Sequence, residues 1–518
     1  MVQLKKIVAE VCAFALICSV LAGCGPKDAS KSEKNDTVIF SQGADPKKID
    51  PAYASDGESS KVICNTFEPL VKFPAGSTEN VEPCLAEKWE ISPDGLTYTF
   101  SLRKGVLFHD ETPFNADAVK KNIERMMDPA GEKPYTDNFS AVEGVTVKDE
   151  STVEIKLKEP YTPFLKNLAM VLGGAMVSPA ALEKRNGDVS TDPTGAGTGP
   201  YKFKKWEKGQ TVVLERNDKY WGDKAKIKNL IFKIIPDTSA RVLALKNGDI
   251  DIMDGVDPNV KEQLTSSGMK IFEIAAQSIN FLAFAMDVPP FDNPEARKAV
   301  AQAIDVKKMV ADLYKGSDKV AHGIFPPTVP GHDPSIELPS YDPDAAKQTF
   351  SELKIKEATM VTYTNQRPYN SVGGKVLAES IQSFLRPVGV ELNIIPLSWG
   401  AYLERVPKRD FSMCVLGWLW DNGDPHNFAQ LLADHKNFLN NPSAYNNPDY
   451  DALMTKGVTL PDGDERTAIY KKGDQLTVKD LPILPISNSS LQAAHRPNIQ
   501  GFAVHPTGNI YFASVSKS

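Results

Sequence analysis

Helix-like and strand-like segments alternate along almost the whole chain, and this alternation limits the folds open to it. The helical segments begin at capping residues such as Asn115 and end at turn signals such as Asp128-Pro129. We expect helices at residues 116–127, 295–304, 344–350 and 376–385. We expect strands at residues 97–102, 152–157, 211–216, 231–235, 390–395 and 411–418. The pattern favours α/β lobes with mixed sheets over an all-α or all-β architecture.

Length and charge further restrict the class of protein to which the chain can belong. A chain of 518 residues is too long for one hydrophobic core, since single cores stop growing beyond about 250–300 residues. The net charge is −7 and no basic block occurs, which argues against nucleic acid as a partner. Beyond the N-terminal segment, no run approaches the roughly 18 apolar residues of a membrane span. We therefore expect two or three domains outside the membrane.

The N-terminus has the layout of an export signal. Lys5 and Lys6 precede an uncharged run at residues 11–22, and the small pair Ala22-Gly23 precedes Cys24. This arrangement resembles a lipobox, in which the cysteine is diacylated and becomes the first mature residue. We expect a signal peptide at 1–23 and a lipidated Cys24 followed by a flexible stalk to residue 37, which would hold the protein at the cell membrane or in the periplasm. The alternative is a plain secretory signal.

Three cysteines remain after the signal segment: Cys64, Cys84 and Cys414. Outside the cytoplasm, Cys64 and Cys84 could form a disulfide whose short loop would stabilise the fold by about 3 kcal/mol. Three buried thiols are the alternative. The sequence leaves both open.

Short motifs along the chain occur together in one known family. They lie at residues 85–89, 94–110, 197–201, 220–222, 241–251 and 296–305. With them the chain resembles the large extracytoplasmic solute-binding proteins, family 5, of peptide and nickel ABC importers. Two more motifs, at 366–370 and 418–425, resemble the dipeptide-binding branch.

The resemblance implies a two-lobed periplasmic-binding-protein-like α/β fold, of type II and the large cluster C form, with an extra subdomain in lobe one. On that template, lobe II is continuous at 281–487 and the extra subdomain covers 68–194. Lobe I takes 38–67, 195–280 and 488–518. Crossovers between the lobes are expected near 278–281 and 486–489.

Two residues of the dipeptide-branch motifs have the charges that a free dipeptide requires. The resemblance implies that Asp421 binds the α-ammonium and that Arg367 binds the α-carboxylate. Arginine suits the second task because its planar fork donates two parallel hydrogen bonds. From the residues alone, Asp421 or Asp424 could equally cap a turn, and Arg367 could be a solvated surface arginine.

Aromatic residues near these motifs could form side-chain pockets and a lid. Tyr369, Trp399 and Trp420 are the candidates, and Gly423 completes the predicted ligand set. We expect Trp418 to be a core residue. His426 is the only histidine near the predicted site in the sequence. Trp399 matches an aromatic that lines the family's pocket.

Motifs for catalysis, cofactors and metals are absent from the sequence. The glycines at 195, 197 and 199 precede Pro200, which lacks the amide that a phosphate cradle uses, so we expect them to be structural. No nucleophile elbow, Walker loop or metal-ligand spacing occurs. We expect no enzyme activity, no cofactor and no metal.

The function expected from the sequence is that of a lipid-anchored, monomeric receptor. It would capture short peptides between two closing lobes and deliver them to the permease of an ABC importer. Among short peptides, we expect dipeptides to be the ligands. The alternatives on the same scaffold are receptors for nickel chelates, haem, glutathione or opines. A secreted hydrolase is the alternative from a different class.

Overall fold

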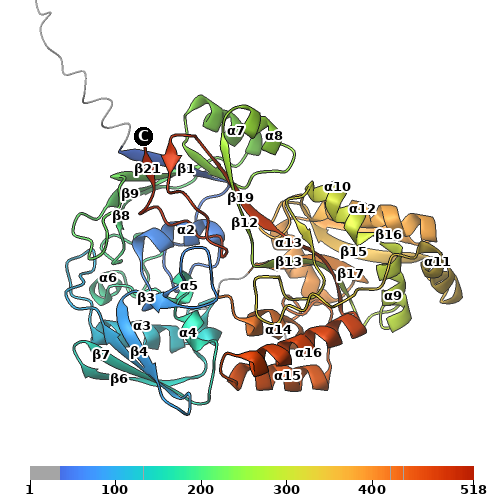
Figure 1. Ribbon diagram of the computed structural model, residues 1–518, viewed down its shortest axis with the longest axis horizontal. Coiled ribbons are helices and arrows are strands. Elements are labelled where there is room, and N and C mark those ends of the chain that lie inside the picture. Colours follow the sequence, from blue (N-terminus) through green and yellow to red (C-terminus); the bar gives the residue numbers. More distant parts are fainter. Residues whose placement is uncertain (1–35, 132, 420–421, 436) are drawn as a thin grey trace, which may run out of the picture.

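The computed structural model describes residues 36–131, 133–419, 422–435 and 437–518. The predicted signal peptide, Cys24, almost all of the stalk, Trp420 and Asp421 lie outside these residues. The described chain forms two lobes of unequal size, and the larger one is built on two main sheets, one of seven and one of four strands (Figure 1).

A seven-stranded sheet forms one part of the larger lobe. Its order is β12-β19-β11-β1-β10-β9-β8, with β1 parallel to both of its neighbours. The core on this sheet includes Phe40, whose ring lies edge-on to Phe232 and Phe512 at 5.6 and 5.5 Å. The strands are β1 Thr37–Gln42, β8 Tyr201–Glu207, β9 Thr211–Arg216, β10 Asn229–Ile234, β11 Ile252–Asp254, β12 Lys270–Ala275 and β19 Ser490–His495, and the helices are α2 Gly57–Thr66, α7 Thr238–Asn247 and α8 Lys261–Ser266.

A four-stranded antiparallel sheet, β4-β5-β7-β6, forms the second part of the larger lobe. Helix α3 begins where the Asn115 side chain accepts a hydrogen bond from the Ala118 amide, and it packs its apolar side chains into the same core as the sheet. The strands are β4 Ala86–Ile91, β5 Thr97–Leu102, β6 Val142–Asp149 and β7 Thr152–Leu157, and the helices are α3 Ala116–Met127, α4 Phe164–Asn167, α5 Val171–Gly174 and α6 Pro179–Lys184.

The smaller lobe is built on a six-stranded sheet of order β14-β18-β13-β17-β15-β16. Its central strand β13 is buried at every position, and its two polar residues, Ser278 and Asn280, are both hydrogen-bonded through their side chains. The strands are β13 Ser278–Phe284, β14 Lys319–Val320, β15 Glu357–Tyr363, β16 Glu391–Leu397, β17 Met413–Leu419 and β18 Ile483–Asn488. The helices are α9 Pro294–Ala303, α10 Val306–Tyr314, α11 Pro343–Glu352, α12 Gly374–Leu385, α13 Trp399–Arg405, α14 Pro425–Ala433, α15 Pro448–Thr459 and α16 Asp464–Asp480.

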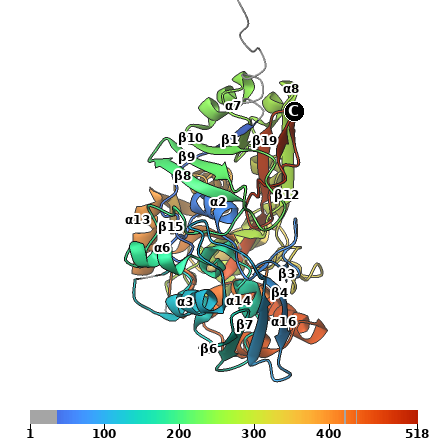
Figure 2. The same cartoon turned by 90° about the vertical axis from the view of Figure 1, so that its left-hand side faces the viewer.

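The chain passes twice between the seven-stranded and six-stranded sheets. It leaves β12 and enters β13 through residues 276–277, and it returns from β18 to β19 through Ser489. The view in Figure 2 shows β12 and β19 side by side, and the two strands are paired along their length. Shorter ladders pair β2 Val71–Lys72 with β3 Glu82–Pro83, and β20 Ile499–Gln500 with β21 Ser516–Lys517.

The local predictions agree well with these elements. The helix at 116–127 and the strands at 97–102, 152–157 and 211–216 have the predicted bounds, and the other predicted segments differ by at most two residues at either end. The glycine loop is structural, as predicted, because a Cβ at Gly197 would lie 1.8 Å from the Thr66 carbonyl oxygen. Within the described residues, no helix is long and apolar enough to cross a membrane.

Cys64, Cys84 and Cys414 are free and buried in the structure. Of the two alternatives that the sequence left open, the structure therefore has three buried thiols and no bridge between Cys64 and Cys84. Burial raises the pKa of the Cys64 and Cys414 thiols to about 12, so both are protonated and unreactive at neutral pH.

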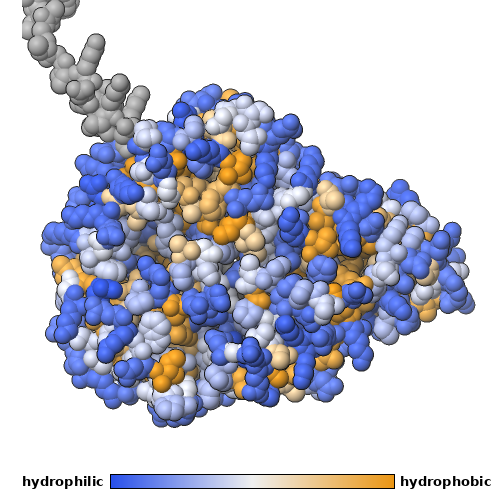
Figure 3. All heavy atoms as spheres, in the orientation of Figure 1, coloured by the Kyte–Doolittle hydropathy of each residue, from blue (hydrophilic) through white to orange (hydrophobic). Residues whose placement is uncertain are grey.

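Polar side chains dominate the face of the molecule that Figure 3 shows. Apolar side chains occur there in separate small patches. Most large apolar side chains are instead buried in the cores on the sheets.

Candidate ligand-binding site

Arg367 lies on a closed turn that follows β15. The backbone amide of Arg367 donates to the Asn370 carbonyl at 3.0 Å, and the Asn370 amide donates back at 2.8 Å. The Asn370 side chain is fully buried, accepts from the Tyr314 hydroxyl at 3.0 Å and donates to the Tyr363 hydroxyl at 3.1 Å. The Tyr314 hydroxyl in turn accepts from Asn280 of β13 at 2.9 Å. This network fixes the turn to the core of the smaller lobe.

The guanidinium of Arg367 stacks on an aromatic cluster. Its Cζ atom lies 4.0 Å from the centroid of the Trp399 ring. Trp399 is itself held by Tyr402, which stacks on it at 5.4 Å, and by the edge of Tyr363 at 5.5 Å. The Nε atom of Arg367 is buried and has no hydrogen-bond partner. A planar cation with an unpaired N–H group has the chemistry needed to bind a carboxylate.

Tyr369 covers the sheet beside Arg367. The residue is 6% exposed, and its hydroxyl has no hydrogen-bond partner. Burial raises the pKa of Tyr369 to about 12, with the Arg367 charge opposing the shift. A Cβ at Gly417 would lie 2.3 Å from Cδ2 of the Tyr369 ring, so only glycine at this position of β17 leaves room for the ring. Sequence reasoning missed Gly417, whose only signal is a glycine inside an apolar strand.

The turn after β17 reaches across to the larger lobe at Gly423. This glycine has a φ of +64°, and a Cβ on it would lie 2.2 Å from the Thr78 hydroxyl oxygen. Thr78 is buried and accepts a hydrogen bond from the Gln277 side chain in the first crossover. The position therefore needs glycine for two reasons, its backbone conformation and its contact with the opposite lobe.

Behind this turn, Asp424 forms a buried ion pair with Arg466 of α16. The two guanidinium hydrogen bonds are 2.7 and 2.9 Å long, and the side chains are 0% and 2% exposed. Asp424 also accepts from the His426 amide at 2.9 Å and so caps α14, which is the turn-capping role considered for it in the sequence. Burial alone would raise the pKa of Asp424, but Arg466 reverses the effect and lowers it.

Helix α4 of the larger lobe contacts the same turn from the opposite side. The Asn422 side chain donates to the Asn167 side chain at 2.7 Å, and Nζ of Lys166 lies 3.5 Å from the Gly423 carbonyl oxygen. Thr162, just before α4, bonds to the carbonyl oxygens of Val458 and Leu460 at 3.0 and 2.6 Å. The lobes are thus in contact around the turn. Sequence reasoning missed these α4 residues because nothing local marks them.

The structure brings part of the predicted set together. Arg367, Tyr369 and Trp399 form one cluster on the smaller lobe, and Gly423 lies on the turn that faces the larger lobe. Asp421 and Trp420 belong to that turn in sequence but lie outside the described residues. Trp418, predicted as core, is half-buried and packs against the core cluster that contains Tyr369.

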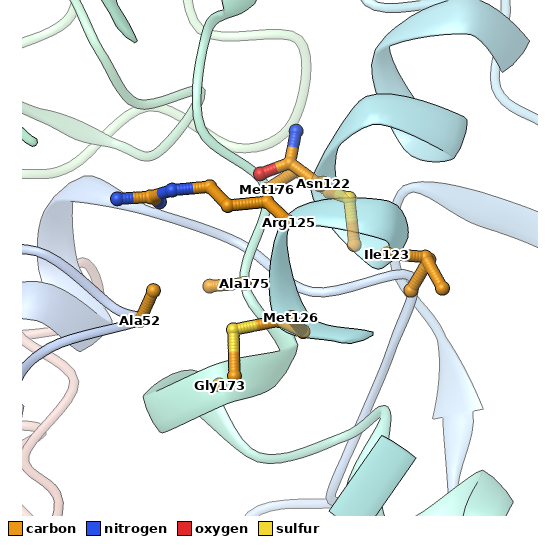
Figure 4. Close-up of a pocket in the computed structure, with 8 residues that line it drawn as sticks. All are labelled: Ala52, Asn122, Ile123, Arg125, Met126, Gly173, Ala175 and Met176. Carbon is orange, nitrogen blue, oxygen red and sulfur yellow. The ribbon is translucent and has the colours of Figure 1, made fainter. Parts of the chain in front are cut away.

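Two cavities in the structure lie away from the predicted ligand residues. One has a volume of about 10 Å³, room for a single water molecule, and Figure 4 shows it beside the Asn122, Arg125 and Met126 side chains of α3. The other, of about 420 Å³, lies between α14 and α15 beside His426 and Asp451. His426 is thus near a hollow but not part of the Arg367 cluster.

The part of the chain that the structure describes contains no cluster of metal ligands. No group of three or more His, Cys, Asp or Glu side chains there is placed to hold a metal ion. Nε2 of His109 is hydrogen-bonded to the Gly199 carbonyl oxygen at 2.9 Å, so this histidine satisfies a backbone group. Burial lowers the pKa of His109 to about 4.

Comparison with known proteins provides further evidence on the class of protein. The family described as "Bacterial extracellular solute-binding proteins, family 5 Middle" matches residues 80–440. Heme-binding protein A of Haemophilus influenzae is 30% identical over 96% of this chain and 97% of that protein. Di/tripeptide-binding protein 1 of Pseudomonas aeruginosa is 31% identical over 93% of this chain and 94% of that protein.

A solved structure agrees with the sequence matches. The periplasmic binding protein DppA from Helicobacter pylori, in complex with the peptide STSA, has a TM-score of 0.81 and 31% identity, and the match covers 94% of this chain and all of that one. The fold and the matches define the class as two-lobed periplasmic binding proteins, which confirms the fold that the sequence resemblance implied.

The chain belongs to the bacterial extracellular solute-binding proteins of family 5. Proteins of this family are extracytoplasmic receptors for solutes, including peptides and haem, and they work with ABC transporters.

Proposed function

We propose that the chain is the receptor of an ABC importer for short peptides, and that its preferred ligands are dipeptides. The observation that carries this is the Arg367 guanidinium, which is stacked on Trp399 and has an unpaired buried Nε atom. In this proposal Arg367 binds the α-carboxylate, Asp421 binds the α-ammonium, and Tyr369, Trp399, Trp420 and Gly423 line the ligand. The two receptor charges then select for ligand length. Both charged ends of the ligand are buried and each needs a partner, so only a ligand of matching length satisfies both.

The proposal includes the architecture given by the sequence resemblance. Lobe I (38–67, 195–280 and 488–518) with its subdomain (68–194) closes on lobe II (281–487) when ligand contacts from both sides favour the closed state. The protein would act as a monomer, anchored through a lipid on Cys24, and would hand its ligand chemically intact to the permease. It would carry no enzyme activity and no cofactor.

Calorimetric titration tests this function directly. Purified mature protein is titrated with Ala-Ala, Ala-Ala-Ala, longer alanine peptides and free alanine. We expect Ala-Ala to bind more tightly than the tripeptide and free alanine not to bind. If no dipeptide binds, the proposal is wrong. Mass spectrometry of the recovered peptide serves as a second readout, since a cleaved product would contradict a receptor role.

A haem receptor is the second candidate, supported by the 30% identity to Heme-binding protein A of Haemophilus influenzae. Titration with haemin, followed by visible absorbance, distinguishes the two. A shifted haem band at stoichiometric protein, together with an absence of dipeptide binding, would favour haem.

A further inference from the structure

Lys166 is a buried cation with almost no hydrogen-bonding partner. The residue is 6% exposed, and the structure gives its Nζ atom one hydrogen bond within the described residues, to the Gly423 carbonyl oxygen at 3.5 Å. This distance is at the outer limit of a hydrogen bond. An ammonium group has three N–H donors, so at least two have no acceptor among the residues that the structure describes.

A second lysine of the same lobe shows what a satisfied buried ammonium looks like. Lys133 is 7% exposed, and its Nζ atom donates to the Asp128 carbonyl oxygen at 2.7 Å and also to the Ala130 carbonyl oxygen. It also lies 5.9 Å from the centroid of the Tyr53 ring. Burial therefore does not by itself leave a lysine unpartnered in this protein.

The nearest negative charge does not satisfy Lys166. The Asp424 carboxylate attracts the lysine, but its oxygens already accept two hydrogen bonds from Arg466 and one from the His426 amide. Lys166 forms no ion pair with any described carboxylate. Taking an ammonium out of water without a close counter-ion is unfavourable, so an additional anion close to its Nζ atom would stabilise this arrangement.

Lys166 also contacts a residue of the proposed ligand set. It projects from α4 of the larger lobe onto the turn that contains Gly423, which we propose as a ligand contact on the smaller lobe. Arg367 and its aromatic support follow a different strand, β15, and we assign them the α-carboxylate. Lys166 therefore contacts the turn that follows Asp421 in the sequence, and Asp421 is the residue that we propose for the α-ammonium of the ligand.

We propose that Lys166 binds the side-chain carboxylate of the ligand's first residue, so that the receptor prefers dipeptides beginning with glutamate or aspartate. This inference rests on the proposed function and adds a specificity to it. The charge-assisted hydrogen bond would supply the close anion that Lys166 lacks.

The test compares an acid with its neutral isostere. Glu-Ala and Gln-Ala differ in one group and share both ends, so a structural role of Lys166 would change their affinities equally. We expect the wild type to bind Glu-Ala about tenfold or more tightly than Gln-Ala by calorimetry. In Lys166→Met the ratio should fall to about one. Lys133→Met, the matched buried control, should keep the wild-type ratio.

Equal affinities of the wild type for Glu-Ala and Gln-Ala would overturn the proposal, as would an unchanged ratio in Lys166→Met. If that variant does not fold, Lys166→Gln, which can still donate to the Gly423 carbonyl, carries the same comparison. Ala-Glu against Ala-Gln locates the preference, and a larger ratio at the second residue would also contradict the assignment. If no dipeptide binds at all, the proposed function itself fails, whereas dipeptide binding without acid preference removes this inference alone.

Discussion

Charged side chains on the two sides of the turn at 422–424 differ in how well they are paired. Behind the turn, Asp424 and Arg466 are fully buried and their hydrogen bonds satisfy each other. Beside it, and among the described residues, Lys166 has one long hydrogen bond and the Nε atom of Arg367 has no hydrogen-bond partner. A buried charge with a complete set of partners stabilises the scaffold, whereas one without partners favours an added ligand of opposite charge. The comparison separates residues that stabilise the scaffold from residues that we propose to bind ligand.

The largest effect is expected from breaking the buried pair. Arg466→Met leaves the Asp424 carboxylate buried without a cation, so we expect a loss of about 3–5 kcal/mol in the free energy of unfolding. Urea denaturation followed by circular dichroism measures it. Arg405→Met is the control, because Arg405 pairs with Asp410 at the exposed surface and should cost about 1 kcal/mol or less. Equal losses in both variants would show that the Asp424 pair has no special structural role.

Asp474 extends the comparison to a buried carboxylate whose Oδ2 atom has no partner within the residues that the structure describes. Its Oδ1 atom accepts from the Ile324 amide at 2.8 Å, and its Oδ2 atom has no partner. Burial raises the pKa of Asp474 to about 7. The folded protein therefore keeps a proton that the unfolded chain releases near pH 4, so this stabilisation is complete below pH 4 and is lost as the pH rises through 7.

The expected result is a difference in pH dependence between the wild type and Asp474→Asn. From pH 4 to pH 8 the wild type should lose up to about 4 kcal/mol more stability than the variant. Urea denaturation at several pH values measures the difference. Asp223→Asn, at an exposed position, should follow the wild type. Parallel curves for wild type and Asp474→Asn would show that this carboxylate is not held protonated.

Removing an unpaired cation should change binding and leave stability almost unaltered. Arg367→Ala takes away the proposed partner of the ligand carboxylate, so we expect Ala-Ala affinity to fall by about 3 kcal/mol, on the order of 100-fold. Thermal unfolding without ligand should change little. Arg386→Ala, an exposed arginine of the same lobe, is the control for calorimetry. A variant that binds as tightly as the wild type would place the site elsewhere.

The smallest effect concerns the support beneath Arg367. Trp399→Leu removes the ring on which the guanidinium stacks, and we expect a loss of about 1 kcal/mol in dipeptide binding, roughly fivefold. Trp206→Leu is the control, because Trp206 also lies under a cation, Lys208 at 5.3 Å, but belongs to the outer strand β8 of the other lobe. If both variants lost affinity equally, stacking at Trp399 would have no specific part in the site.

Much of the local structure could be predicted from the sequence. The helix at 116–127 has its bounds set by Asn115 and by the turn at Asp128, and both act through neighbouring backbone groups. The strand at 97–102 alternates buried and half-buried residues, a pattern that is visible without its partners. These signals are short-range, so the fold around them does not need to be known.

The sequence predicted only part of the site. Arg367, Tyr369 and Trp399 were chosen from motifs, and the structure brings them together. Gly417, Thr78 and Lys166 were missed, because their roles depend on contacts with residues distant in sequence, such as Lys166 with Gly423 across 257 positions. No local pattern encodes a contact of that kind.

By itself, the sequence determined where helices and strands form, which family the chain belongs to, and which residue types could bind a zwitterion. Only the tertiary structure decided which buried charges are paired. Arg466 meets Asp424 across 42 positions and becomes part of the scaffold, while Lys166 and Arg367 have donors without an acceptor in the described part of the chain. The physical reason is that the state of a buried charge is set by its neighbours in space, and packing chooses those neighbours.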